Sequence, residues 1–243
     1  MTFLGHHDHL ELCRDLPESI SGYLAYPPGD AIAALRDPRG RTVRCTPWRR
    51  TVMHRVSDDA KLFCKHRLGR VRAACDEWRI LQDLAALGLP VPAPVFRARS
   101  GRQTVVGMRG LSGRPIDALL AERALAPWIL DAAAAMLRRL HEGGWVFRDM
   151  YWNHVLADQA TQRLGLVDVE RAFRPRWRVR RWVVKDLAGL LSSVPAGASV
   201  RRTDALRFLT AYLGGRTAGW RELARAVQAK ADRIRGHRPR YPG

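Results

Sequence analysis

Two aspartates, Asp149 and Asp168, stand 19 positions apart in a segment where apolar runs alternate with turns. Asp149 follows a long run with helical periodicity, and Asp168 ends a short apolar run. Between them, residues 154–156 and 163–167 have the pattern of a hairpin, whose open end would hold both carboxylates. Such carboxylates could bind Mg²⁺ and orient a hydroxyl group. The alternative is that Asp149 is a loop residue at a helix end and that Asp168 forms a turn.

Phosphoryl transfer from ATP requires groups of this kind, together with a cation that holds the nucleotide phosphates. Lys65, in the predicted strand KLFCKHRL, is the candidate cation. Lys61 shares its strand face because side chains alternate with a period of two, but Lys65 is flanked by more of the apolar strand and is preferred. A solvated strand lysine is the alternative.

Glu77 is the candidate partner of this lysine. It lies on the same face of a predicted helix as Ile80, Leu81 and Leu84, where an unpaired carboxylate would be costly to bury. A pair between Lys65 and Glu77 would hold the lysine on the nucleotide phosphates. Alternatively, Glu77 lies in the first turn of its helix, where the helix dipole favours a carboxylate.

Further polar and aromatic residues accompany the two aspartates. Asn153 and His154 could reach a metal or a phosphate oxygen, although such a pair alone is more often part of a turn. Asp186, near the start of a predicted apolar helix, could accept hydrogen bonds from the backbone of the Asp149 loop or cap its own helix. Trp177 and Trp182 could stack on sugar rings or on bases. Six arginines could bind phosphate or carboxylate groups of an acceptor, or form a solvated segment: Arg171, Arg174, Arg176, Arg178, Arg180 and Arg181.

The elements around these residues divide the chain into an N-terminal extension at 1–40, a β-rich segment at 41–108 and a helical segment at 109–243. Three runs between 42 and 68 predict an antiparallel meander, which a helix within 73–88 and two strands within 93–110 follow. A long helix is predicted within 126–144, with one apolar face: Ile129, Ala133, Met136, Leu137 and Leu140. The order indicates an α+β fold with a sheet lobe, a helical lobe and a cleft between them.

The composition adds a strong basic excess. The 243 residues include 42 Lys and Arg against 23 Asp and Glu, a formal net charge of +19. Arginine supplies almost all of it, as a GC-rich genome would, but nucleic acid, an anionic membrane or a phosphorylated substrate would also suit this charge. The four cysteines lack metal-site spacing, so we expect reduced thiols in the cytosol. We expect neither a signal peptide nor a membrane span.

Three segments in order resemble the lipopolysaccharide core kinases of Gram-negative bacteria, the heptose and Kdo kinases, which share a protein-kinase-like fold. VFRDMYWNHVLAD is similar to the catalytic loop of that family, LVDVERAFRPRW to its metal-binding segment, and RRWVVKDLAGLLSS to the helix that follows. CDEWRILQDLAALGLPVPAPV is a weaker match to the helix of the first lobe. The resemblance covers about residues 60–195.

The resemblance implies that ATP and Mg²⁺ serve as phosphoryl donor and cofactor, and that a heptose or Kdo hydroxyl of the lipopolysaccharide inner core is the acceptor. Asp149 would be the catalytic base, and Lys65 with Glu77 would hold the phosphates. Asp168 and His154 would bind Mg²⁺ and the nucleotide. The remaining implied roles are adenine contact at the hinge 105–108 for Val106 and Met108, acceptor binding for Tyr151, Arg171 and Arg174, and structural support for Arg148 and Asp186.

Two departures from the family pattern bear on activity. Phe147 stands where a histidine usually precedes the Arg-Asp pair, and we expect it to fill the same volume without removing the base. No glycine-rich phosphate loop is visible in VRCTPWRRTV, which leaves nucleotide affinity open. We predict a cytoplasmic enzyme, peripheral on the anionic inner face of the inner membrane, where its glycolipid acceptor is built. The alternatives are a pseudokinase or glycolipid-binding scaffold and a small-molecule kinase of the aminoglycoside or choline type; nucleic acid is not an expected partner.

Overall fold

The computed structural model describes residues 9–13, 18–24, 40–58, 60–68, 72–100, 102–198 and 200–236. Most of the predicted N-terminal extension lies outside these residues. The contacts divide the chain into two compact units, Met1–Ala85 with Val91–Leu111, and Ala86–Pro90 with Ser112–Gly243. The boundaries predicted at 40 and 108, and the cleft, stay predictions. The described elements are a mixture of α and β, as the sequence predicts.

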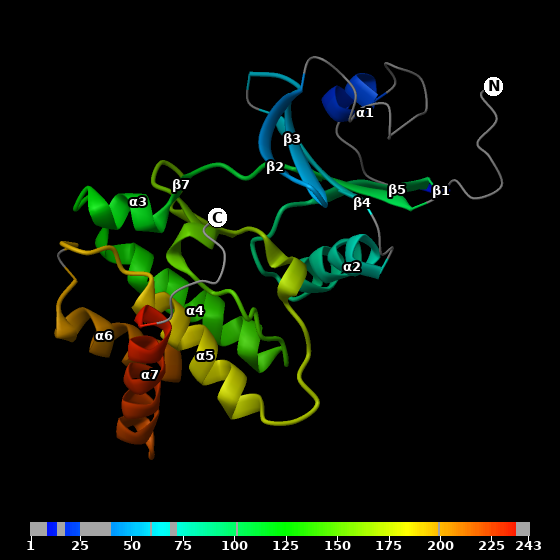
Figure 1. The fold of residues 1–243 in the computed structure, drawn as a ribbon. Helices are drawn as coiled ribbons and strands as arrows, with labels where there is room; N and C mark the ends of the chain where they lie inside the picture. Colours follow the sequence, from blue (N-terminus) through cyan, green and yellow to red (C-terminus); the bar gives the residue numbers. More distant parts are fainter. Residues whose placement is uncertain are drawn as a thin grey trace. The chain divides into compact units, whose positions relative to one another are not determined.

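The first unit is built on an antiparallel six-stranded sheet with the order β1-β5-β6-β4-β3-β2 (Figure 1). Its elements are β1 His9–Leu12, α1 Glu18–Leu24, β2 Arg41–Thr46, β3 Arg49–Arg55, β4 Lys61–Leu68, α2 Arg72–Ala86, β5 Pro94–Ser100 and β6 Gln103–Arg109. The predicted meander of β2, β3 and β4 is confirmed, and so are α2 and the pair of β5 and β6. Strand β1 and helix α1 were not predicted.

Close packing holds this sheet together. Apolar side chains of β4, β5 and β6 form one cluster with Ile20 of α1. A Cβ at Gly107 would lie 2.2 Å from the ring of Phe96 on the neighbouring strand, so the absence of a side chain lets that ring lie on the sheet.

The second unit joins a small three-stranded sheet, β7-β8-β9, to a set of helices (Figure 1). Its elements are β7 Arg114–Pro115, α3 Ile116–Ala121, α4 Pro127–Glu142, η2 Trp152–His154, β8 Val155–Asp158, β9 Arg163–Leu166, η3 Val169–Arg171, α5 Val179–Ser192, α6 Arg202–Leu213 and α7 Trp220–Arg235. The predicted hairpin and the predicted buried face of α4 are confirmed. The short strand β7 was not predicted. Within the described residues, no helix is both long enough and apolar enough to span a bilayer.

Candidate active site

The loop that carries Asp149 follows α4 and has a tightly restrained backbone. Gly144 has a φ of 77°, in the left-handed region that glycine enters without a steric penalty. Val146 and Phe173 exchange two backbone hydrogen bonds of 3.0 Å. Arg148 has a φ of 70°. A residue with a side chain holds that conformation only where its surroundings enforce it.

Asp186 of α5 provides this restraint. Its carboxylate is fully buried, and its two oxygens accept hydrogen bonds from the backbone N–H groups of Phe147 at 2.7 Å and Arg148 at 2.8 Å. Asp186 lies in the middle of Val179–Ser192 and not in its first turn, so the alternative that it caps the helix is wrong. The sequence also predicts hydrogen bonds to the loop backbone, and these are the contacts that Asp186 makes.

A buried relay continues from Asp186 to two other helices. His141 of α4 places Nε2 3.2 Å from Asp186 Oδ2 and Nδ1 2.8 Å from the hydroxyl of Tyr212 in α6. The Asp186 carboxylate can only accept, so His141 donates its Nε2 proton to it. Burial raises the pKa of Tyr212 to about 12, so its hydroxyl stays protonated beside Nδ1, and every group of the relay has a partner. Hydrogen bonds to each group offset the free-energy cost of burying the Asp186 carboxylate.

Helix α5 also lies directly against the loop. A Cβ at Gly189 would be 2.2 Å from the carbonyl oxygen of Met150, so the helix can approach the backbone only because a glycine stands there. Phe147, the replacement for the usual histidine, is fully buried and meets the His154 ring edge-on, with 6.0 Å between centroids. The loop is thus packed by the backbone of α5 at Gly189 and by the buried ring of Phe147.

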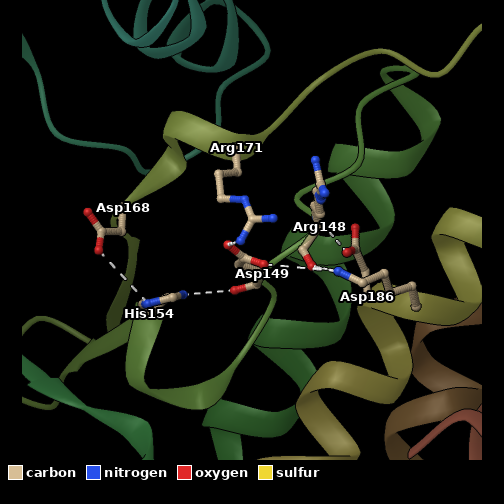
Figure 2. Close-up of polar contacts among 7 residues, drawn as sticks. Arg148, Asp149, His154, Asp168, Arg171 and Asp186 are labelled. Carbon is tan, nitrogen blue, oxygen red and sulfur yellow. Dashed lines mark hydrogen bonds and ion pairs between the residues drawn. The ribbon is translucent and has the colours of Figure 1, made fainter. Parts of the chain in front are cut away.

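Two cations face the carboxylate of Asp149. Arg171 of η3 binds Asp149 Oδ2 at 2.6 Å (Figure 2). The Lys185 ammonium lies 4.0 Å from Oδ1. Lys185 also donates a hydrogen bond to the carbonyl oxygen of Arg148. The loop backbone and the side chain of its aspartate are therefore held by the same lysine.

The environment of Lys185 weakens its hold on its proton. Partial burial lowers the pKa of the ammonium below its ordinary value, and attraction to Asp149 and Asp186 offsets only part of that effect. Sequence reasoning missed Lys185, although it directly precedes Asp186 in the segment that resembles the family. It also missed His141 and Tyr212, because nothing in the sequence links residues 45 or more positions apart.

His154 connects the two aspartates (Figure 2). Its Nδ1 donates a hydrogen bond of 2.8 Å to the carbonyl oxygen of Asp149, and its Nε2 lies 4.0 Å from Asp168 Oδ2. The hairpin places it there, because Val155 pairs with Leu166 and the Val167 N–H donates to the His154 carbonyl at 2.9 Å. Asp149 and Asp168 are thus near each other, as predicted, and the imidazole ring of His154 lies between them.

The residues around Asp168 fit a divalent cation through oxygen. Asp168 has a φ of 61°, follows the end of β9, and keeps its side chain 28% exposed. Mg²⁺ prefers oxygen ligands and retains several waters, so the carboxylates of Asp168 and Glu170, which offer oxygens within 4.8 Å of each other, suit it. His154 offers only Nε2, since Nδ1 is engaged with Asp149, and nitrogen is not the donor that Mg²⁺ prefers. Its role as a metal ligand stays a prediction, and contact with a phosphate oxygen suits the same nitrogen.

Lys65 and Glu77 form a buried ion pair in the first unit. The Lys65 ammonium of β4 lies 2.6 Å from Glu77 Oε1 of α2, and the two side chains are 7% and 1% exposed. Lys61 is exposed on the same strand, so the buried, paired lysine is the one that the sequence analysis prefers. The contact predicted between Lys65 and Glu77 is present, and its role on phosphates stays a prediction.

The predicted hinge at 105–108 is not a connecting segment. Val106 and Met108 lie inside β6, buried, and pair with Lys65 and Phe63 of β4. The strand continues to Arg109, so the chain leaves the sheet only at Gly110. Adenine contact by Val106 and Met108 stays a prediction.

The predicted acceptor-binding residues have different surroundings. Tyr151 and Arg171 line a pocket beside Asp149, of about 880 Å³, within the second unit. Partial burial, and then the nearby charge of Asp149, raise the pKa of the Tyr151 hydroxyl. Arg174 does not line this pocket, because its guanidinium stacks over the ring of Trp145 at 5.1 Å. Its acceptor role, like those of Tyr151 and Arg171, stays a prediction.

Comparisons with known proteins place this geometry in context. The lipopolysaccharide kinase (Kdo/WaaP) family profile matches residues 37–212, more than half of the chain. The structure of WaaP in complex with acyl carrier protein is 25% identical, with a TM-score of 0.70 and coverage of 94% of this chain and 98% of that chain. None of the curated protein sequences matches.

Two aminoglycoside phosphotransferases share the fold alone. The aminoglycoside-3'-phosphotransferase of type VIII is 18% identical with a TM-score of 0.55, and the match covers 82% of this chain and 97% of that chain. The phosphotransferase APH(3'') of type Id from Streptomyces rimosus is 14% identical with a TM-score of 0.60, and coverage is 87% and 98%.

Proposed function

The chain belongs to the lipopolysaccharide kinase (Kdo/WaaP) family and is a phosphotransferase that acts on a sugar hydroxyl of the lipopolysaccharide core. We propose that ATP, with Mg²⁺, is the phosphoryl donor and that a heptose or Kdo residue of the inner core is the acceptor. The observation that carries the proposal is the restrained loop. Asp186 anchors its backbone, and Asp149 presents a carboxylate between Arg171 and Lys185. A fixed carboxylate beside a pocket is what orientation of an attacking hydroxyl requires.

We propose the following roles for the chain's own residues. Asp149 orients the acceptor hydroxyl and accepts its proton as the hydroxyl attacks. Arg171 and Lys185 hold the carboxylate in place, and their contacts at 2.6 Å and 4.0 Å support this role. Because Oδ1 is the less engaged oxygen, it is the one that receives the proton.

We assign donor binding to the residues predicted for it. Asp168 would hold Mg²⁺, which when bound would neutralise charge on the nucleotide phosphates. His154 Nε2 would contact a phosphate oxygen, and Lys65, positioned by Glu77 at 2.6 Å, would contact others. The accessible carboxylate of Asp168 supports the first assignment, and the buried ion pair supports the last.

The experiment that tests the proposal uses purified full-length protein, ATP, Mg²⁺ and lipid A that carries two Kdo residues and one heptose. We expect acceptor-dependent release of ADP and a glycolipid heavier by one phosphoryl group in mass spectra. Removal of Mg²⁺ with EDTA should stop both signals. A protein that binds the glycolipid but releases no ADP, and whose melting temperature does not move with ATP and Mg²⁺, would instead be the scaffold.

Two other parts of the proposal concern location and partner. We propose that the enzyme works on the cytoplasmic face of the inner membrane, supported by its net charge of +19. Sedimentation with vesicles should increase with the fraction of anionic lipid and decrease with salt. Equal sedimentation with neutral vesicles would contradict it.

We also propose acyl carrier protein as a partner, since the relative at 25% identity is seen in complex with one. An observation on this chain supports an acyl chain as the bound group: an apolar cavity of about 320 Å³ between α5, α6 and α7, lined by residues such as Leu187, Leu190, Phe208 and Val227. Acyl carrier protein carrying a decanoyl chain should co-elute with this protein and raise its melting temperature. Acyl carrier protein without an acyl chain should co-elute less and raise the melting temperature less. Equal effects of the two forms would exclude the cavity as the binding site of the acyl chain.

A further inference from the structure

We propose that helix α7 makes the pocket beside Asp149 an anion-binding site, in which Lys230 and Arg233 select acceptors that carry a carboxylate or phosphate near the reacting sugar. This inference rests on the proposed function, because Asp149 marks the pocket as the place of the acceptor. It adds to that function the residues that choose among acceptors.

The lining of the pocket is strongly basic. Lys and Arg make up 42 of the 243 residues of the chain, but seven of the 13 residues that line this pocket of about 880 Å³. Asp149 is the single acidic residue among them. The general basic excess of the chain therefore does not account for the lining, and a ligand with negative charge would complement it.

Neutralisation inside the protein accounts for only some of these cations. Arg171 is paired with Asp149 at 2.6 Å, and Arg180 with Glu222 at 2.6 Å. Lys185 also lies near Asp149, at 4.0 Å. In the part of the chain that the structure describes, the remaining four pocket cations form no ion pair with a carboxylate: Arg148, Arg181, Lys230 and Arg233. Arg233 Nε donates a hydrogen bond of 3.2 Å to the Ala229 carbonyl, and the Arg181 guanidinium lies over the Trp182 ring. Among the described residues no carboxylate neutralises the charge of these four groups, so an anion that enters the pocket would complement it.

The side of the pocket formed by α7 is shaped to let a ligand approach. Its four lining residues are Ala226, Ala229, Lys230 and Arg233, whose spacing of three and four residues places them on one helix face. The two alanine side chains are small, so they leave space for a ligand beside Lys230 and Arg233. Val227 and Ala231, on the neighbouring face, are buried. The helix is thus fixed by its apolar face while its cations stay beside the pocket.

The placement of these cations is unfavourable without a ligand. Lys230 and Arg233 are three residues apart on the helix, and like charges at this spacing destabilise it slightly. A carboxylate or phosphate between them would remove that repulsion and accept charge-assisted hydrogen bonds from both.

Helix α7 lies outside the residues that the family profile matches. The family profile ends at residue 212, whereas α7 spans Trp220–Arg235. The loop with Asp149 and the anchor Asp186 lie inside the matched residues. The proposed catalytic residues therefore lie within the matched sequence, and the proposed anion-binding cations of α7 lie outside it.

The test compares two double variants that lose the same charge. Lys230→Gln/Arg233→Gln removes the pocket cations, and Arg216→Gln/Arg221→Gln removes two arginines that stack on Trp220 outside the pocket. With lipid A carrying two Kdo residues and one heptose, we expect the first variant to raise the KM for the acceptor by about 10-fold or more, with kcat changed by less than about two-fold. The control should keep the wild-type KM. An unchanged KM in the first variant would overturn the inference.

Modified acceptors identify the anion. One arm uses the same glycolipid with its Kdo carboxyl groups methylated, and the other uses it without the lipid A phosphates. The wild type should lose affinity in one arm, and the α7 variant should show no further loss in that arm. Wild-type discrimination that persists in the variant would overturn the inference.

Acceptor binding without ATP, measured by calorimetry, separates this inference from the proposed function. Stronger binding by the wild type than by the α7 variant supports the inference even if no phosphoryl transfer is seen. Equal binding by both proteins, or binding by neither, would overturn it. The proposed function fails separately, if the wild type binds these acceptors and never phosphorylates them.

Discussion

The two units each contain an ion pair of the same length in opposite surroundings. Lys65 and Glu77 meet at 2.6 Å with side chains 7% and 1% exposed, whereas Arg171 and Asp149 meet at 2.6 Å with side chains 47% and 19% exposed. Burial makes the first pair difficult to separate, because water cannot take the place of either partner in a buried site. Water can replace either partner of the second pair at little cost.

This difference in burial distinguishes residues that position their neighbours from residues that can contact a substrate. A buried group such as Glu77 or Asp186 has its partners inside the protein and sets the position of a neighbour. A partly exposed group such as Asp149 can exchange a partner for a substrate. We therefore expect changes at buried groups to reduce stability strongly, and changes at exposed ones to reduce activity while leaving stability nearly intact.

Asp186→Ala should have the largest effect on stability. It leaves the N–H groups of Phe147 and Arg148 and the ring of His141 without their shared acceptor in a buried site. We expect a loss of about 3–5 kcal/mol in the free energy of unfolding. Urea denaturation followed by circular dichroism measures it. As a control, Asp131→Ala removes an exposed carboxylate paired with Arg207 and should barely move the midpoint.

Glu77→Gln should have the next largest effect. The change keeps the shape of the side chain but removes the negative charge that Glu77 places 2.6 Å from the buried ammonium of Lys65. We expect a loss of about 2–4 kcal/mol in the same experiment, together with weaker ATP binding. Glu142→Gln, which breaks an exposed pair with Arg138, is the matched control. Equal stability of the two variants would show that burial does not distinguish the ion pairs.

The sequence predicted most of the support around the reactive groups because that support is local. The hairpin follows from two short apolar runs joined by a turn, and it alone brings His154 next to Asp168. The face of α2 that carries Glu77 follows from helical periodicity. Both signals lie within a few residues of the group that they position.

The parts that the sequence did not predict depend on contacts across long separations. Tyr212 reaches His141 from 71 positions away, and the HLEL strand β1 is recognised only by its pairing with β5. Lys230 and Arg233 look like any exposed helical cations until their helix is placed beside Asp149. The position of Asp186 in the middle of its helix was also missed, because a run of arginines hides the helix start at Val179.

Arg171→Gln should separate activity from stability. Because the guanidinium is about half exposed, we expect the free energy of unfolding to change by less than about 1 kcal/mol. Asp149 then loses its closest positioning contact, and kcat should fall by about 10-fold or more. Arg138→Gln, in an exposed pair on α4, should change neither quantity. A stability loss as large as that of Glu77→Gln would contradict the comparison.

Lys185→Arg should have the smallest effect, and a pH profile reveals it. Burial lowers the pKa of Lys185, so the wild-type lysine loses its charge below the ordinary lysine value as pH rises. Its hold on Asp149 and on the loop backbone then weakens, and kcat/KM should decline on the alkaline side. Arginine stays charged, so the decline should move to higher pH in the variant. An alkaline limb at the same pH in both proteins would exclude Lys185 as its source.

Single-turnover phosphoryl transfer by Asp149→Asn is the most direct test of the central claim that Asp149 orients the acceptor hydroxyl and accepts its proton. With ATP, Mg²⁺ and the inner-core glycolipid all saturating, we predict that the rate falls by about 10³-fold. The anchor at Asp186 remains, so the free energy of unfolding should stay within about 1 kcal/mol of the wild type. A variant that is equally stable and transfers phosphate within about 10-fold of the wild-type rate would contradict the claim.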